Sequence, residues 1–267
     1  MDSKLTLLKE FYRSLPNDRA KVETASHGFP YLAELLSDGA SLEYGEAHPS
    51  GSLYKYKLAH ISAHRMDELL RSHVEKSSNV CLYFADLANA MFCFNLDNNH
   101  KSDNEAIIPE MAAALDLLRG QLSSIGIEPL VIPSGRGCHL WCRLDAPLEN
   151  GQLYRFMLRS MVLTFAELHK KGFDHAKIKA NFYPDIRIRN TVSLRLFGSD
   201  HARTKRFSRI LTESGLLDEE ASWAAFEYYL KNKTLSAEQF HRAYSQMPDS
   251  DFVQPFAPGD ADRNHPV

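Results

Sequence analysis

The chain has 267 residues, of which 44% are hydrophobic and 24% are charged, and its formal net charge at pH 7 is -3. This composition excludes a disordered chain, and the charge excludes a protein that coats nucleic acid through overall positive charge. No apolar run approaches the about 20 residues that cross a bilayer, and the amino terminus lacks the pattern of a secretion signal. We therefore expect a cytoplasmic protein without a membrane partner, with one sizeable core or two closely joined lobes.

The amino-terminal part of the chain is predicted to contain two helices and two strands. The spacing of leucine and phenylalanine predicts a helix over residues 3–15, and residues 18–60 mix short elements with loops rich in Gly, Ser and Pro. A second helix is predicted over about Ser62–Lys76. Strands Val80–Phe84 and Met91–Leu96 follow it.

Two polar residues share one face at the end of the second strand. Side chains alternate along a strand, so Asn95 and Asp97, at positions i and i+2, lie side by side. Oxygen ligands in this arrangement can hold a divalent cation. The same residues also suit a turn completed by Asn98, Asn99 and His100, because Asn and Asp are common turn formers. The pattern alone leaves both interpretations open.

A helix and a β-hairpin come next. Asp103 is the predicted N-cap of a helix over residues 106–125, whose apolar residues recur at helical spacing, and Gly126 ends that helix. Strands Leu130–Ile132 and Cys138–Leu144 are predicted to pair around the turn between them. This turn is the most informative segment of the chain.

The turn has the sequence Pro-Ser-Gly-Arg-Gly. Gly135 and Gly137 permit positive φ or close approach to a ligand, and the neighbouring Ser134, Arg136 and His139 supply donors suited to phosphate oxygens. Alternation along the following strand directs one face to the core and the other to chemistry. An ordinary tight loop and a buried, hydrogen-bonded histidine are the alternatives. The core face holds Cys138, Leu140, Cys142 and Leu144, and the other face holds His139, Trp141 and Arg143.

A third polar segment follows an amphipathic helix predicted over residues 151–171. Strands are predicted from Ile186 through Phe197, with Asp185 at their start. Asp185 also suits a surface ion pair with a neighbouring arginine, a contact worth about 0–1 kcal/mol. On the predicted strand, Asp185, Arg187 and Arg189 share one face, while Ile186 and Ile188 face a core.

A concentrated positive patch comes after this segment, on a chain whose net charge is negative. The patch also suits a solvated surface. Its residues are Arg195, His201, Arg203, Lys205, Arg206 and Arg209, and Gly198 and Ser199 lie among them.

The last part of the chain is predicted to be helical over residues 219–231 and 236–246. The fold class is therefore α+β, with a mixed or antiparallel sheet flanked by helices and a small carboxyl-terminal helical region. We expect that region either to close the fold or to contact DNA, and the sequence leaves both interpretations open. The expected organisation is a mixed segment over 1–60 that packs on a core over 61–214, a helical accessory region over 215–247, and a flexible tail or linker over 248–267.

The four cysteines all lie in apolar, strand-like runs. Their spacing does not form the paired pattern of a zinc site, so we predict buried, reduced thiols and no structural zinc. They are Cys81, Cys93, Cys138 and Cys142.

The order of these segments resembles the archaeo-eukaryotic primase superfamily, the primase-polymerases of plasmids, phages and mobile elements. The resemblance covers about residues 80 to 210. It consists, in chain order, of an Asp-x-Asp-like strand end, a helix, the motif Ser-Gly-Arg-Gly-x-His-x-Trp, a strand with one acid, and the motif Arg-Leu-x-Gly-Ser-x-His-x-x-Thr. The resemblance implies a primase-polymerase core with Mg²⁺ or Mn²⁺ at Asn95, Asp97 and Asp185, which together with His139 are the implied catalytic residues. It also implies nucleotide contacts from Ser134, Gly135, Arg136, His139, Arg195, Ser199 and His201, and DNA contacts from Arg187, Arg203, Lys205 and Arg206.

One residue departs from the family pattern. The first metal-binding position is normally aspartate, and Asn95 offers an amide oxygen without charge, which weakens the binding of two cations. The sequence leaves open whether this asparagine is natural or introduced.

The function implied by the resemblance is DNA-templated nucleotidyl transfer, which makes or extends primers on single-stranded DNA from nucleoside triphosphates. By the same resemblance, we expect that activity to be weakened or disabled by Asn95. The resemblance leaves open a helicase, or a further domain of a longer chain, as an additional partner. A catalytically inert module of a replication or defence system, which binds nucleotides and single-stranded DNA, remains an alternative. So does a metal-dependent nuclease.

Overall fold

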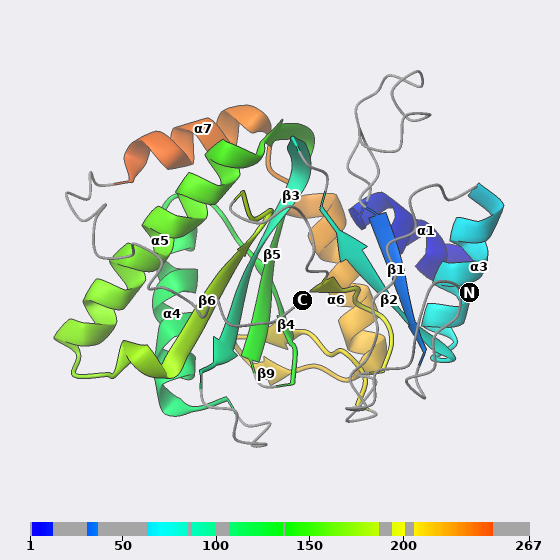
Figure 1. The fold of residues 1–267 in the computed structure, drawn as a ribbon, viewed down its shortest axis with the longest axis horizontal. Helices are drawn as coiled ribbons and strands as arrows, with labels where there is room; N and C mark the ends of the chain where they lie inside the picture. The colour runs from blue at the N-terminus through cyan, green and yellow to red at the C-terminus, as the bar shows by residue number, and fades with distance from the viewer. Residues whose placement is uncertain are drawn as a thin grey trace, which may run out of the picture.

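A computed structural model describes most of the chain between residues 2 and 247, and Figure 1 shows its arrangement. The described residues are 2–12, 31–36, 63–84, 87–99, 107–135, 137–186, 194–200 and 206–247. The helices are α1 (Asp2–Tyr12), α3 (Ala63–Val74), α4 (Pro109–Ser124), α5 (Asn150–Lys170), α6 (Glu219–Asn232) and α7 (Ala237–Gln246), with a 3₁₀ turn over His175–Lys177. The strands are β1 (Tyr31–Leu36), β2 (Ser78–Tyr83), β3 (Ala88–Asn98), β4 (Leu130–Pro133), β5 (Gly137–Glu149), β6 (Ile178–Tyr183), β7 (Leu194–Arg195), β8 (Leu211–Thr212) and β9 (Gly215–Leu216).

A four-stranded antiparallel sheet in the order β4-β5-β3-β6 forms the centre of the molecule. A second antiparallel sheet, β1-β2-β7, lies beside it, and β8 and β9 form a small hairpin. The fold is therefore α+β with an antiparallel central sheet flanked by helices, as predicted. The described helices include none that is both long and apolar enough to cross a membrane.

One face of the central sheet packs against α4, α5 and α7 (Figure 1). Phe92, Phe94 and Leu96 of β3 alternate with residues of the other face, and all three are completely buried. On α4 the apolar residues recur every three or four positions, which gives that helix one stripe facing the sheet. These are Met111, Leu115, Leu118 and Leu122.

The opposite face of the sheet forms a second hydrophobic core, together with α1, α6 and the β2–β7 region. Trp141 is completely buried there, and its ring contacts Tyr12 at 5.4 Å and Phe84 at 6.0 Å between centroids. Arg143 is also buried and donates to the carbonyl of Ala90 at 2.7 Å. The prediction that this face carries chemistry along the whole strand is therefore wrong, because the sheet lies between two layers and both faces need apolar residues.

Helices α6 and α7 belong to these cores. The Tyr229 hydroxyl of α6 donates to the Trp141 carbonyl at 3.0 Å, and Phe226 stacks on Phe197 at 4.7 Å between ring centroids. In α7, Phe240 packs against Phe156 of α5 at 5.0 Å between ring centroids. The carboxyl-terminal helices therefore close the fold. The domain boundary at residue 214 stays a prediction.

The predicted helices lie within a few residues of the observed ones, with one difference at the start of α4. Its N-cap is Ile108 rather than Asp103, and proline follows at the first helical position. Proline suits that position because its φ is already helical and its missing N–H has no partner there anyway.

Strand β6 was not predicted, and the predicted strand that begins at Ile186 is wrong at its start. Ile186 is 52% exposed, so it does not face a core, while Ile178 and Phe182 of β6 do. Lys179 and Asn181 alternate with those two residues, and the low strand propensity of Lys and Asn conceals the pattern.

The three cysteines whose side chains are described, Cys93, Cys138 and Cys142, are free and buried, as predicted. Burial raises the pKa of the Cys138 thiol to about 12, and the carboxylate of Asp97 adds to that rise. The side chain of Cys81 lies outside the described residues.

The burial of Phe226 provides a test of the domain boundary. Phe226→Ala should lower the free energy of unfolding by about 3–5 kcal/mol, because it removes a fully buried aromatic ring. Tyr228→Ala on the same helix, where the side chain is 59% exposed, should change it by no more than about 0.5 kcal/mol. Urea unfolding followed by circular dichroism should show one transition. Two transitions, of which only one shifts, would establish a separate accessory region.

Candidate functional site

The register of the central sheet brings five polar residues to one end of one face. Asn95 of β3 lies opposite His139 of β5 and Asn181 of β6, and Asp97 lies opposite Gly137 of β5 and Lys179 of β6. Directly opposed residues of antiparallel strands project from the same face, with Cβ atoms about 4.5–5.5 Å apart. We call Asn95, Asp97, His139, Asn181 and Lys179 the polar ladder.

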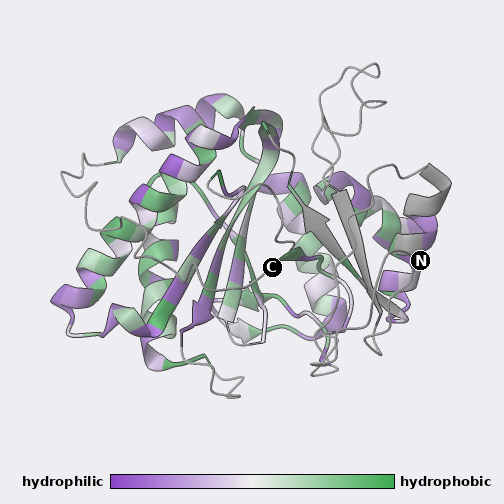
Figure 2. Cartoon of the chain, in the orientation of Figure 1, coloured by the Kyte–Doolittle hydropathy of each residue, from purple (hydrophilic) through white to green (hydrophobic). Residues whose placement is uncertain are grey.

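The polar ladder begins where the second hydrophobic core ends. Figure 2 shows β3 changing from hydrophobic to hydrophilic toward its carboxyl end. Asn95 is 7% exposed and His139 is 8% exposed, whereas Lys179 is exposed to solvent. The His139 ring lies edge-on to Trp141, with 6.2 Å between ring centroids. The ladder therefore has a buried end at Asn95 and His139 and a solvent-exposed end at Lys179, within three residues along each strand.

Asn95 forms a direct contact within the ladder. Its side-chain nitrogen Nδ2 donates to Oδ2 of Asp97 at 3.3 Å. Its oxygen Oδ1 is buried and has no hydrogen-bond partner among the described residues. A buried acceptor of this kind can accept a hydrogen bond from water or coordinate a cation.

The Tyr183 phenol lies within reach of the same group. Burial raises the pKa of Tyr183 to about 12, and the carboxylates of Asp185 and Asp97 add to the rise, while a hydrogen bond from Asn95 lowers it. Both carboxylates therefore act on one buried hydroxyl. Sequence patterns did not identify Tyr183, although it is the residue of β6 opposite Cys93.

The oxygen donors at this end of the sheet suit Mg²⁺ or Mn²⁺, which prefer carboxylate and carbonyl oxygens. Asp97 and the unpartnered Oδ1 of Asn95 fit such an ion. Asp185, however, lies two residues beyond Tyr183, the last residue of β6, so it is not a member of the polar ladder. The residue of β6 that lies opposite Asn95 is Asn181. Among the described residues, no group of three or more His, Cys, Asp or Glu side chains is arranged to hold a metal ion. The three-residue metal site stays a prediction.

The turn between β4 and β5 holds the ladder in register. The Ser134 N–H donates to the Gly137 carbonyl at 2.8 Å, and Gly135 has a φ of 101° that favours glycine. At Gly137 a Cβ atom would lie 1.7 Å from the Leu96 carbonyl oxygen. The expected positive φ is therefore found at Gly135, whereas the close approach at Gly137 is to the backbone of β3. Close approach of these glycines to a ligand stays a prediction. The Ser134 hydroxyl is buried without a partner among the described residues.

Two buried side chains, those of Tyr12 and His73, hydrogen-bond to the backbone of the segment that contains Arg195 and Ser199. The Phe197 N–H donates to the Tyr12 hydroxyl at 2.9 Å, and the Phe197 carbonyl lies 3.0 Å from Nε2 of His73. Nδ1 of His73 accepts from the Val80 N–H at 3.0 Å, so Nε2 must carry the proton and the ring is neutral. Burial lowers the pKa of His73 to about 3, and the charge of Arg195 contributes to the fall.

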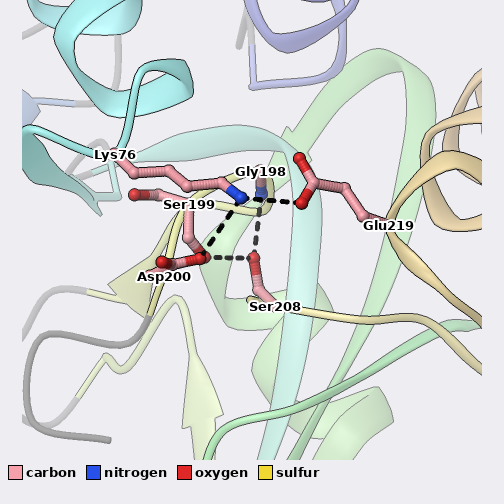
Figure 3. Close-up of polar contacts among 6 residues, drawn as sticks. All are labelled: Lys76, Gly198, Ser199, Asp200, Ser208 and Glu219. Carbon is pink, nitrogen blue, oxygen red and sulfur yellow. Dashed lines mark hydrogen bonds and ion pairs between the residues drawn. The ribbon is translucent and has the colours of Figure 1, made fainter. Parts of the chain in front are cut away.

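A polar cluster fixes the far end of this segment (Figure 3). Nζ of Lys76 lies 2.7 Å from Oε2 of Glu219 and 3.7 Å from Oδ1 of Asp200. The hydroxyl of Ser208 accepts from the Gly198 N–H and donates to the Ser199 carbonyl, both at 2.9 Å. The hydrogen bond to Glu219 raises the pKa of Lys76.

The same cluster includes contacts between Asp200, Phe207 and Lys76. Asp200 and Phe207 form a β-bridge, and Nζ of Lys76 lies 5.0 Å from the centroid of the Phe207 ring. Ser199 itself is completely buried, whereas Arg206 is exposed. Three predicted contacts of the stretch 201–205 lie outside the described residues, namely His201, Arg203 and Lys205, as do Arg136 and Arg187 elsewhere.

The ladder adds two residues that the motif patterns missed. Lys179 and Asn181 lie on β6, and the signal that could have found them is the alternation of Ile178, Ala180 and Phe182 with polar residues. Asn95, Asp97 and His139 come together as expected, while Ser134 and Gly135 lie in the adjoining turn.

Comparisons with known proteins give distant structural similarity. No protein-family profile matches the chain, and no curated protein matches its sequence. The chain is similar to the polymerase domain from Mycobacterium tuberculosis ligase D in complex with DNA, with 14% identity, a TM-score of 0.43, and coverage of 92% of this chain and 93% of that one. It is also similar to the AEP domain of the cyanophage S-2L primase-polymerase, with 12% identity, a TM-score of 0.34, and coverage of 78% and 97% respectively. At these values neither similarity identifies a function.

The close approach at Gly137 predicts a sharp difference between two glycine variants. Gly137→Ala should destabilise the protein and displace Asp97, because the added carbon would collide with backbone rather than with a movable side chain. Gly120→Ala in α4, where nothing lies within 4 Å of the new carbon, should be neutral or stabilising by up to about 1 kcal/mol. Thermal unfolding of both variants checks this, and equal melting temperatures would contradict it.

The buried His73 predicts a dependence of stability on pH. Its folded-state pKa of about 3 lies below the ordinary histidine pKa of 6.5, so only the unfolded chain gains a proton as the pH falls between these values. His73 should therefore remove up to about 1.4 kcal/mol of stability per pH unit across this interval, and nothing above pH 7. Urea unfolding at pH 7 and pH 5 should show a smaller loss in His73→Gln and His73→Asn than in the parent. His241→Gln, on the surface of α7, should retain the parental loss.

Proposed function

We propose that the chain is a DNA-templated nucleotidyltransferase of the primase-polymerase type, with a centre weakened at Asn95. The observation that carries the proposal is the polar ladder. Asn95 and Asp97 from one segment and His139 from another meet on one face at one end of the sheet. The family resemblance gives these same positions to metal and nucleotide binding. A merely structural turn or a satisfied core histidine would not require that convergence.

In this proposal, one set of residues binds the cation and another set binds the nucleotide. Asp97, with Asn95 and Asp185, would hold Mg²⁺ or Mn²⁺, which neutralises charge on the attacking and leaving oxygens of a phosphoryl transfer. His139 and the Ser134–Arg136 turn would bind the triphosphate. The buried Ser134 hydroxyl, which lacks a partner among the described residues, is consistent with that role.

The arginine-rich segment would bind the phosphates that lie outside this centre. Nucleotide contacts are proposed for Arg195, Ser199 and His201, and template contacts for Arg187, Arg203, Lys205 and Arg206. Ser199 is completely buried, so its contact would have to come from the backbone or after a rearrangement. Contacts to the DNA backbone release counterions, so template binding should weaken steeply with salt.

An inert module that binds nucleotides and DNA is the second candidate, and one contact favours it. The Asn95 amide donates to Oδ2 of Asp97, and that lone pair is then unavailable to a cation. An aspartate at position 95 would instead place two carboxylates side by side, an arrangement that a divalent cation stabilises. With asparagine at this position, a hydrogen bond to Asp97 takes the place of the repulsion between two carboxylates that a cation would otherwise relieve.

Primer extension on single-stranded DNA with Mn²⁺ or Mg²⁺ tests the proposal. Asn95→Asp should extend a primer at least about tenfold faster than the parent, since it restores a carboxylate at the centre. Asn99→Asp is the matched control, because it adds the same charge to an exposed position just beyond β3 and should leave the rate unchanged.

The remaining outcomes separate the candidates. If neither protein makes product but both bind nucleoside triphosphate, the inert module is the better account. Hydrolysis of DNA that needs metal but no nucleotide would favour a nuclease. If Asn95→Asp neither binds triphosphate nor makes product, the proposed function is wrong.

A further inference from the structure

Lys179 stands on the site face at the outer end of the polar ladder. It is the second residue of β6, after Ile178, and it lies directly opposite Asp97 of β3. Its side chain is exposed to solvent, while its neighbour across the strand, Asp97, is partly buried. The sequence motifs give this lysine no role.

Most lysines of the described part of the chain are committed to carboxylates. Lys177, two residues earlier, lies 2.5 Å from Glu110, and Lys76, Lys231 and Lys233 have partners within 2.8 Å. Lys179 makes no such ion pair with a described residue, and neither does Lys171 at the end of α5. The Lys179 ammonium can therefore donate its three N–H groups to a ligand.

The charge of the ladder differs from that of a centre built on three carboxylates. The ladder contains one carboxylate, Asp97, and one ammonium, Lys179, and the other three members are the amides of Asn95 and Asn181 and the ring of His139. With a neutral imidazole its formal charge is zero. Such a site attracts a divalent cation less strongly, and it repels a phosphate less strongly.

We propose that Lys179 binds a phosphate group at the polar ladder, and that this contact retains phosphate when divalent metal is absent. The proposal rests on the proposed function for the class of ligand, and it adds a binding residue and a metal-independent mode. A charge-assisted hydrogen bond from an ammonium suits a phosphate oxygen. Asn181, the next residue of β6 on the same face, provides a further N–H donor. The phosphate belongs either to a nucleoside triphosphate or to the backbone of DNA, and the two are distinguished by experiment.

The test measures binding of deoxyadenosine triphosphate and of a single-stranded oligonucleotide, each in Mg²⁺ and in EDTA. The parent chain should bind at least one of them in EDTA, and Lys179→Met should weaken that binding about tenfold. Lys179→Arg should recover much of it. The matched control is Lys171→Met, which removes the same charge from another exposed lysine and should leave affinity unchanged.

Each outcome has a defined meaning. A loss for the triphosphate alone, or for DNA alone with a salt slope reduced by about 1, identifies the source of the phosphate and supports the proposal. Equal affinities of Lys179→Met and Lys171→Met for both ligands would overturn it, as would binding that disappears in EDTA. Primer extension by Asn95→Asp is independent of these results, so failure of the proposed function and failure of this inference can be told apart.

Discussion

Strand β3 lies between two hydrophobic cores, and this double burial determines where polar chemistry can occur. Phe92, Phe94 and Leu96 fill one core, and Met91 and Cys93 fill the other. A polar side chain in the middle of the strand would need a complete set of buried partners, which costs more than an apolar residue of similar size. Polar residues can therefore gather only where one core ends, and that is the end occupied by Asn95 and Asp97.

Gly137 of the turn has a structural role beside this polar end of β3. Gly137 lies opposite Asp97, and the absence of a side chain lets β5 approach the Leu96 carbonyl so closely that no Cβ could fit. The turn is thus tied to the backbone beside the acid. The nucleotide-binding turn and the metal-binding strand of the proposed centre cannot move independently, which is how a site gains precise geometry from a rigid element.

Sequence patterns predicted much of this arrangement and missed a defined part of it. Helix periodicity located the helices because their apolar stripes are long, and the Ser-Gly-Arg-Gly turn located the hairpin. Strand β6 was missed because Lys179 and Asn181 have low strand propensity and only burial on the other face makes the segment a strand. The second core was missed because Trp141 looks like part of a binding face until α1 and α6, far away in sequence, are seen to cover it.

The composition of the ladder limits what the centre can do. A cation-binding centre requires negative charge concentrated in a small volume. The one carboxylate of the ladder, that of Asp97, accepts a hydrogen bond from the Asn95 amide and lies opposite Lys179. Each of these features weakens the attraction of the site for a divalent cation and reduces its repulsion of an anion such as the proposed phosphate. An aspartate at position 95 would place a second carboxylate beside Asp97 and make the site more anionic. Because Lys179 lies opposite Asp97, even that variant would retain a positive charge beside the proposed metal ligands, so its affinity for divalent cations should remain below that of a three-carboxylate centre.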